Sequence, residues 1–573
     1  MENKTGVYVL SAGGKMTYRS KEQKYFSGPG AAHRRAIYKG CGYDDIDLSS
    51  PLIGVVNTSN DAALGHVHLD TLAEHVKAGI WQAGGTPFEF STISTCGEVP
   101  IGTPYFRYEL VIRDVIASSV EIVANEQLFD GLVLLASCDS IIPGVIIGAL
   151  RTGIPTIFLS GGPQLPGKFE GKEVVTSQLG QEVFGAGNSE ERTLERLKAF
   201  ENKVCPGPGA CSLMGTANTM QIITEAMGLS LPGSSTVPAV YAEKLRFARK
   251  TGRRIVEMVK DDVAPSKIIT RESLLNGVVV ELGIAGSTNA VLHLISFARE
   301  MGIDLDLNDF DRLSRKVPVI SRVIPTGSAT VVDLHNAGGV PAVMGELSSM
   351  LDGNALSCSG MTVKEIIHDA RSRDTAVLTT VKEPVSESGG IAVLKGSLAP
   401  SGAICRTTTI PGNRMSHKGP ARVFHSDEDA HHAVVSGKVK VGDVIIIRYE
   451  GPIGAPGMRE MMMTTDALVG MGKADDIFVV TDGRFSGFTE GSAIGHVAPE
   501  AAVGGPIAIV EDGDQVVIDI ASRKLDLAIS EEEISRRLAK WSPPQPNAQR
   551  GILALYAKTA LQAHEGAMMD DRL

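Results

Sequence analysis

Several short segments of the chain carry side chains that could bind a metal ion or activate an acid. The first is Cys138-Asp139-Ser140, which ends the apolar run that begins near residue 130. A thiolate is a soft ligand that suits iron, whereas a carboxylate is a hard ligand that suits Mg²⁺. Ligands of open α/β sheets gather outside the carboxyl ends of strands, so a strand here would present both groups to a site. A buried cysteine beside a helix-capping aspartate explains the same residues.

A second thiol, Cys211, lies in the Gly-, Ser- and Thr-rich segment 209–219, which leads into an apolar, helix-like stretch. If a helix begins here, free backbone N–H groups surround the thiol and favour an anionic sulfur or ligand. The alternative is an ordinary helix entry with a buried cysteine. The segment therefore predicts a second candidate for a metal-binding thiol.

Two further segments present an acid and a hydroxyl on tight turns. Residues 450–460 contain so many Gly and Pro residues that they predict a rigid loop, with Glu450 and Glu460 at its ends. Ser486 is followed by Gly487, shortly after an apolar run, as a base or nucleophile on a sharp turn would be. The pattern is not G-x-S-x-G, and no His and Asp spacing completes a hydrolase triad. A turn with a solvated Glu is the plainer interpretation of residues 450–460, and the Ser486 pattern taken alone is weak.

The elements that must position these residues follow from the hydrophobic pattern. Between Pro51 and about Gly345, short Val/Ile/Leu runs alternate with amphipathic stretches, which indicates a parallel sheet covered on both faces. After about Pro384, short strands joined by Gly and Asp turns indicate a mostly-β, barrel-like domain. A helix is expected from Ser530, where a capping box begins, and a helical tail follows. We therefore predict an α/β domain over residues 1–385 and a β domain with terminal helices over 386–573.

The composition excludes several classes of function. A net charge of −11 and a pI near 5.7 argue against a nucleic-acid partner, which requires a basic stripe. There is no run of 18 or more apolar residues to span a membrane, and the first residues lack the apolar core of a signal peptide. The 7 cysteines are therefore expected to be reduced thiols in a cytoplasmic protein.

Taken together and in this order, the segments resemble the family of dihydroxy-acid, sugar-acid and phosphogluconate dehydratases. The resemblance runs from about Pro29 to the C-terminal helix and rests on strings such as ASCDSIIPG, ACSLMGTANTM, RYEGPIGAPGMREM and TDGRFSGFTEG. It implies an α/β domain that carries the metals, a C-terminal β-barrel that swivels over them, and a homodimer or dimer of dimers. It also implies a hydro-lyase that removes water from a small 2,3-dihydroxy acid, branched-chain or sugar acid, to leave a 2-keto acid.

The resemblance further implies Mg²⁺ and an iron–sulfur cluster held by three cysteines. Residue by residue, it assigns the cluster to Cys138 and Cys211, Mg²⁺ to Glu98, Asp139 and Glu460, and removal of the C2 proton to Ser486. Two positions depart from the family pattern. Gly65 stands where the family has its first cluster cysteine, and Ser140 stands where the family has a lysine that is carbamylated toward Mg²⁺.

Three explanations of these departures stay open. A substitute ligand, His66 or Cys96, could complete the cluster, since His replaces Cys on iron in some clusters; a solvated His66 and a small buried Cys96 are the plainer interpretations. A divalent cation with acid–base side chains could act without a cluster. The chain could also bind a ligand or a partner without turnover. Because Asp139, Glu460 and Ser486 are all present, we expect an active hydro-lyase.

Overall fold

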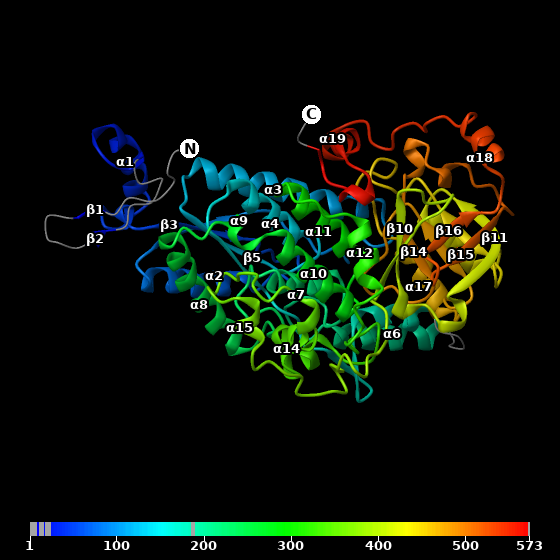
Figure 1. Cartoon of the computed structure of the whole chain (residues 1–573), viewed down its shortest axis with the longest axis horizontal. Helices are drawn as coiled ribbons and strands as arrows, with labels where there is room; N and C mark the ends of the chain where they lie inside the picture. Colours follow the sequence, from blue (N-terminus) through cyan, green and yellow to red (C-terminus); the bar gives the residue numbers. More distant parts are fainter. Residues whose placement is uncertain (1–8, 11–15, 18–24, 185–189, 571–573) are drawn as a thin grey trace.

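The computed structural model describes residues 9–10, 16–17, 25–184 and 190–570 (Figure 1). Its N-terminal half is built on a four-stranded sheet in the order β4-β3-β5-β6, with every neighbouring pair parallel. The strands are β3 (Leu52–Asn57), β4 (Thr86–Ser91), β5 (Gly131–Ala136) and β6 (Thr156–Ser160). All residues of β3, β5 and β6 are buried, as continuous Val/Ile/Leu runs predict for a sheet covered on both faces. The predicted α/β fold of this half is confirmed.

Helices cover the two faces of this sheet in close-packed pairs. Helices α2 (Leu69–Gln82) and α8 (Ala242–Lys260) lie on one side, and α3 (Tyr108–Glu126) and α4 (Ile141–Thr152) lie on the other (Figure 1). Glycines allow the helices of each pair to approach closely. A Cβ atom on Gly252 of α8 would lie 2.1 Å from the carbonyl oxygen of Val76 in α2, and one on Gly148 of α4 would lie 2.5 Å from that of Ala117 in α3. The helices of each pair therefore pack directly against each other beside the sheet.

The predicted alternation of strands and helices up to Gly345 is wrong beyond β6. Apart from the short hairpin of β7 (Gly167–Phe169) and β8 (Lys172–Val174), the described residues from 161 to 390 form helices and loops. Besides α8, these helices are α5 (Leu179–Phe184), α6 (Glu190–Val204), α7 (Thr216–Ala226), α9 (Pro265–Ile268), α10 (Arg271–Ile284), α11 (Asn289–Glu300), α12 (Leu307–Ser314), α13 (Val331–Asn336), α14 (Gly339–Glu346) and α15 (Val363–Ile367). Helix α10 is buried from Asn276 to Ile284 without a break, so it lacks the polar face that distinguishes a helix from a buried strand.

The C-terminal half is a barrel-like sheet of eight strands in the order β16-β15-β11-β12-β13-β14-β10-β9. The strands are β9 (Ile391–Leu394), β10 (Gly402–Arg406), β11 (Ser416–Phe424), β12 (Val444–Ile447), β13 (Phe478–Thr481), β14 (Ala493–Ala498), β15 (Gln515–Asp519) and β16 (Lys524–Leu527). The two edges nearly close on each other, because the N–H of Leu525 donates to the carbonyl of Lys395 at 3.0 Å. The predicted mostly-β, barrel-like fold is confirmed.

Four helices accompany the barrel. Helices α16 (Asp427–Val435) and α17 (Met462–Gly470) pack against each other, and α18 (Glu531–Leu538) is capped by the Ser530 side chain as predicted. The last helix, α19 (Gly551–Thr559), returns to α3, and Arg113 of α3 donates to the carbonyl of Ala567 at 2.8 Å. The C-terminal segment thus joins the two halves. None of the helices in the described part of the chain is long and apolar enough to cross a membrane.

Candidate active site

Loops from both halves enclose a small pocket of about 110 Å³ that collects most of the side chains singled out in the sequence. Its lining includes Cys96, Glu98, Cys138, Asp139, Cys211, Glu460 and Ser486. Cys138 and Asp139 follow β5, and Cys211 precedes α7. Glu460 precedes α17, and Ser486 follows β13. Residues that are hundreds of positions apart therefore meet at the carboxyl end of a buried strand, where α/β proteins bind ligands.

One side of the pocket holds the thiols. The Cys211 thiol donates a hydrogen bond to Glu98 Oε1 at 2.9 Å, and the Thr176 hydroxyl donates to the same oxygen at 3.4 Å. Burial, reinforced by nearby acidic groups, raises the pKa of Cys138 and Cys211 well above the ordinary value, so both thiols are protonated when no metal binds. Cys205 lines the same pocket. Sequence reasoning missed it, since only a Pro-Gly turn marks its position.

Gly65 explains how this side differs from the family pattern. A Cβ atom placed on Gly65 would lie 2.5 Å from the sulfur of Cys138. Position 65 therefore faces the pocket, and the Cys138 thiol occupies the space that a side chain at this position would need. Any third thiol must come from elsewhere in the chain.

His66, the first candidate substitute ligand, is turned away from the pocket and is fully buried. Its Nε2 accepts a hydrogen bond from the Cys138 N–H at 3.1 Å, and its Nδ1 lies 3.0 Å from the Thr58 carbonyl. Burial lowers the pKa of His66 to about 3, so the ring is neutral. Both ring nitrogens have partners, and we infer that His66 fixes the backbone of Cys138 and does not bind a metal.

The opposite side of the pocket holds acids. The Asn289 amide donates to Glu460 Oε1 at 2.6 Å, and burial raises the pKa of Glu460 to about 7. Burial, together with the charges of Glu109 and Glu460, raises the pKa of Asp139 well above its ordinary value. Asp139 Oδ1 is buried without a hydrogen-bond partner, and the nearest nitrogen recorded for it is His293 Nε2 at 3.6 Å. A buried carboxylate oxygen with no partner is a ligand position for a hard cation.

Ser486 lies on a turn that is pressed against the start of α7. A Cβ atom on the next residue, Gly487, would lie 2.5 Å from the backbone nitrogen of Thr216, so only glycine allows this approach. The Ser486 side chain also hydrogen-bonds with the Glu460 carboxylate. A hydroxyl beside a helix N-terminus is favourably placed to become an anion, because the free N–H groups and the helix dipole offset negative charge.

Arg406, at the end of β10, fixes this turn from the barrel side. Its buried guanidinium donates to the carbonyls of Gly286 at 3.0 Å, Met214 at 3.2 Å and Gly487. One side chain thus connects the Ser486 turn to the loop that carries Cys211. No motif marked Arg406 in the sequence.

The donors suit the two groups that the family resemblance implies, but they are not arranged as closed sites. Among the described residues, no three His, Cys, Asp or Glu side chains lie close enough together to hold a metal ion as they stand. The unpartnered oxygen of Asp139 and the neighbouring carboxylates suit Mg²⁺. The thiols suit iron in their chemistry, although position 65 supplies none. Binding either group therefore requires side-chain movement.

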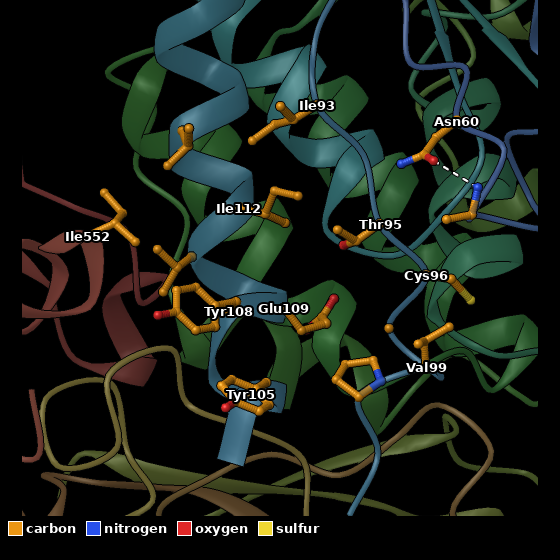
Figure 2. Close-up of a pocket in the computed structure, with 15 residues that line it drawn as sticks. Asn60, Ile93, Thr95, Cys96, Val99, Tyr105, Tyr108, Glu109, Ile112 and Ile552 are labelled. Carbon is orange, nitrogen blue, oxygen red and sulfur yellow. Dashed lines mark hydrogen bonds between the residues drawn. The ribbon is translucent and has the colours of Figure 1, made fainter. Parts of the chain in front are cut away.

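A larger cavity of about 660 Å³ adjoins the pocket and shares Cys96, Gly97 and Glu109 with it. Its walls are mainly apolar and come from the 93–100 segment, the start of α3 and Ile552 of α19. In Figure 2, Glu109 lies between Tyr108 and Val99. The larger cavity lacks the group of thiols and acids described above, so we place the chemistry in the smaller one.

Comparison with known proteins identifies relatives along nearly the whole chain. Residues 50–366 match the description "Dihydroxy-acid/6-phosphogluconate dehydratase N-terminal", and residues 376–567 match its C-terminal counterpart. The dihydroxy-acid dehydratase of Ignicoccus hospitalis is 48% identical over 96% of this chain and 100% of its own length. Those of Acetivibrio thermocellus and Pyrococcus furiosus are each 46% identical over 94% of this chain and 98% of their own lengths.

Proposed function

The chain belongs to the dihydroxy-acid/6-phosphogluconate dehydratase family, and we propose that it dehydrates a 2,3-dihydroxy carboxylic acid in the pocket around Asp139, Glu460 and Ser486. It is a hydro-lyase, as its family is. The observation that carries the proposed location is that these three side chains come from three separate segments and line the same pocket. The substrate is a branched-chain dihydroxy acid or a sugar acid, and the product is a 2-keto acid.

Mg²⁺ and an iron–sulfur cluster, when bound, would supply positive charge to the substrate carboxylate and 2-hydroxyl and Lewis acidity to the departing 3-hydroxyl. Asp139 and Glu460 would hold Mg²⁺, a proposal supported by the unpartnered Asp139 oxygen. Glu98, the third ligand that the resemblance implies, stays a prediction. In the structure its carboxylate accepts hydrogen bonds on the thiol side of the pocket.

The side chains of the chain itself account for the proton transfer. Ser486 removes the C2 proton, and the N-terminus of α7 beside it lowers the cost of the negative oxygen. Loss of the 3-hydroxyl gives an enol, which gains a proton at C3 to become the 2-keto acid. Arg406 and Gly487 hold the serine oxygen in position, which matters because proton transfer requires close and directed contact.

We propose Cys96 as the third thiol, together with Cys138 and Cys211. Cys96 lines the same pocket and lies close enough for its charge to raise the pKa of both other thiols, after burial. Cys205 is the matched comparison, because it lines the pocket but is exposed. Anaerobic reconstitution should load iron and acid-labile sulfide into the Cys205→Ala variant but not into Cys96→Ala. If Cys96→Ala binds as much iron as the unmodified chain, Cys96 is not a ligand.

A direct assay tests the proposed activity. The protein is supplied with Mg²⁺, with and without anaerobic iron–sulfide reconstitution, and a panel of 2,3-dihydroxy and aldonic acids is offered. Semicarbazide should trap a 2-keto acid from at least one of them. Absence of a ketone under both conditions would favour the non-catalytic alternative, in which the chain binds an acid or a partner, and isothermal titration would then detect that binding.

We also propose a homodimer in the cytoplasm, with domains divided near residue 385. We place the dimer contact at the mouth of the apolar cavity, because the side chains of Val99 and Tyr105 at its wall are 75% and 70% exposed. A second copy would cover these side chains. Sedimentation should show a dimer that Tyr105→Glu dissociates, and an unaffected Tyr105→Glu dimer would place the contact elsewhere.

A further inference from the structure

We propose that Glu109 is a ligand of the divalent cation and replaces the group that Ser140 cannot supply. This inference rests on the proposed function, since it concerns the same pocket. Glu109 is the second residue of α3 and is only 6% exposed. Nothing in the sequence distinguishes it from the acidic residues that commonly begin a helix.

The contacts of Glu109 place its carboxylate on the acid side of the pocket. The Ser140 hydroxyl donates to Glu109 Oε1 at 2.8 Å, and the other carboxylate oxygen pairs with the buried guanidinium of Arg484. Arg484 also reaches Glu460 Oε1 at 3.4 Å. The Arg484 guanidinium therefore bridges Glu109 and Glu460, whereas Ser140 contacts Glu109 directly.

A glycine makes room for this arrangement. A Cβ atom on Gly97 would lie 3.1 Å from Glu109 Cγ and 3.8 Å from its Oε1. Any larger residue at position 97 would compete with Glu109 for this space. The side chain of Glu109 thus occupies a gap that the backbone of the 93–100 segment leaves open toward the pocket.

Charge balance supports a cation at this position. Glu109 and Glu460 contact Arg484, and the charge of Asp139 also acts on it, whereas the nearby Arg113 pairs with Asp114. When all three acids are ionised, one guanidinium leaves two negative charges, which one divalent ion neutralises. Two buried polar atoms also lack partners and face each other, Asp139 Oδ1 and His293 Nε2, at 3.6 Å. Buried polar groups without partners are costly, so a bound ion with its water would satisfy them.

The substitution at position 140 then has a chemical meaning. A carbamylated lysine ends in a carboxylate-like group, and it reaches the metal from position 140. Ser140 cannot form a carbamate, but its hydroxyl donates a hydrogen bond to a true carboxylate that comes from α3. In both cases the ligand is a carboxylate-like group, but here it comes from Glu109 of α3 and not from the residue at position 140. Because no carbamate is needed, cation binding should not depend on dissolved carbon dioxide.

Glu98 is the alternative third ligand, and the structure separates the two. Glu98 accepts hydrogen bonds from Cys211 and Thr176 on the thiol side, whereas Glu109 lies with Ser140 and Arg484. The matched pair of variants is therefore Glu109→Gln and Glu98→Gln. Each replaces one carboxylate that lines the same pocket with an uncharged amide of nearly the same size.

The test is binding of Mn²⁺, a Mg²⁺ substitute, to the full-length protein, measured by electron paramagnetic resonance of the free ion. Glu109→Gln should weaken Mn²⁺ binding at least tenfold, and Glu98→Gln less than threefold. Added bicarbonate should change neither the Mn²⁺ affinity of the unmodified protein nor the order of affinities among the variants. If Glu109→Gln fails to fold, Glu109→Asp keeps the charge, shortens the reach, and should also weaken binding. Unchanged affinity in Glu109→Gln or, failing that, Glu109→Asp overturns the inference.

Asp139→Asn separates this inference from the proposed function. Loss of Mn²⁺ binding in Asp139→Asn with wild-type binding in the Glu109 variants would refute Glu109 alone. Wild-type binding in Asp139→Asn would instead show that the proposed cation site is wrong altogether. A strict dependence on bicarbonate would also count against Glu109, because a carbamate would then be required on some other lysine.

Discussion

Replacing Gly487 with alanine is expected to disable the enzyme without unfolding it. The new Cβ atom would lie 2.5 Å from the Thr216 nitrogen, 2.7 Å from the Gly215 Cα and 2.8 Å from the Gly215 carbonyl carbon. All three atoms belong to the backbone at the start of α7, so no side chain can rotate away. The Ser486 turn must therefore move outward from the helix.

The size of the movement sets the size of the effect. An ordinary van der Waals contact for a Cβ atom begins near 3.4 Å, so the turn must shift by about 0.9 Å. A misplacement of about 1 Å in a catalytic group can cost on the order of 10² in rate. The strain of overpacking costs about 1–3 kcal/mol of stability. We expect kcat to fall about 100-fold, while KM changes little because the cation site is untouched.

The matched control is Gly412→Ala, since no atom lies within 4 Å of a Cβ placed there and its backbone is not left-handed. The assay is the rate of 2-keto acid formation, followed as its semicarbazone, with thermal unfolding measured in parallel. Gly412→Ala should keep both properties. A Gly487→Ala enzyme with wild-type kcat would show that contact with α7 does not position Ser486, and the assigned role of that turn would be lost.

Four further outcomes are expected. Ser486→Ala should abolish turnover while its unfolding midpoint and Mn²⁺ affinity stay unchanged; residual wild-type activity would remove Ser486 from the mechanism. Arg406→Lys keeps the charge, but a lysine cannot donate to all three carbonyls of Gly286, Met214 and Gly487. We expect kcat to fall by about tenfold or more while KM stays the same. An unchanged kcat would show that Arg406 does not hold the Ser486 turn in place. Burial lowers the pKa of His66 to about 3 from 6.5, so the unfolded chain takes up its proton first and stability falls as the pH drops below 6.5. The His66 contribution to this loss should be about 2 kcal/mol between roughly pH 7 and pH 5, so in urea unfolding His66→Gln should lose about 2 kcal/mol less than the unmodified protein. His293 and His496, whose pKa values burial also lowers, contribute in both proteins. An identical pH dependence in both proteins would show that His66 is not buried and neutral. Finally, the raised pKa values of Cys138 and Cys211 predict that iodoacetamide labels the exposed Cys41 and Cys205 first in metal-free protein. Peptide mass spectrometry measures the labelling of each cysteine. Equal labelling rates at all four cysteines would refute the buried, protonated state of Cys138 and Cys211.

The sequence predicts those parts of the fold in which local pattern and burial agree. The run before Cys138 is apolar at every position, and it becomes β5, buried throughout. Short strands between Gly and Asp turns become the barrel. The pattern fails where a helix is buried on all sides, as in α10, because no polar face remains to reveal the helical period.

The site shows a similar division. Cys138, Asp139 and Ser486 line one pocket as the sequence suggests, because each lies in the loop after a strand, where the fold requires loops to meet. No motif marks Glu109 or Arg406, because what distinguishes them is their contacts with residues far away in the chain. His66 is an example of a side chain whose direction the sequence does not show. Because His66 is adjacent to Gly65, it is a candidate ligand from the sequence, but its ring points away from the pocket and accepts a hydrogen bond from the Cys138 N–H. Spacing along the chain does not fix the direction in which a loop side chain points.

The most direct test of dehydration by proton removal is the isotope content of the product. The reaction is run in D₂O with a 2,3-dihydroxy acid that carries ordinary hydrogen at C2, and the 2-keto acid is examined by NMR. If Ser486 removes the C2 proton and the enol is later protonated, C3 of the product carries one deuterium from solvent and Ser486→Ala yields no product. A product whose C3 hydrogen comes intact from C2 of the substrate, or no keto acid at all, would contradict the account.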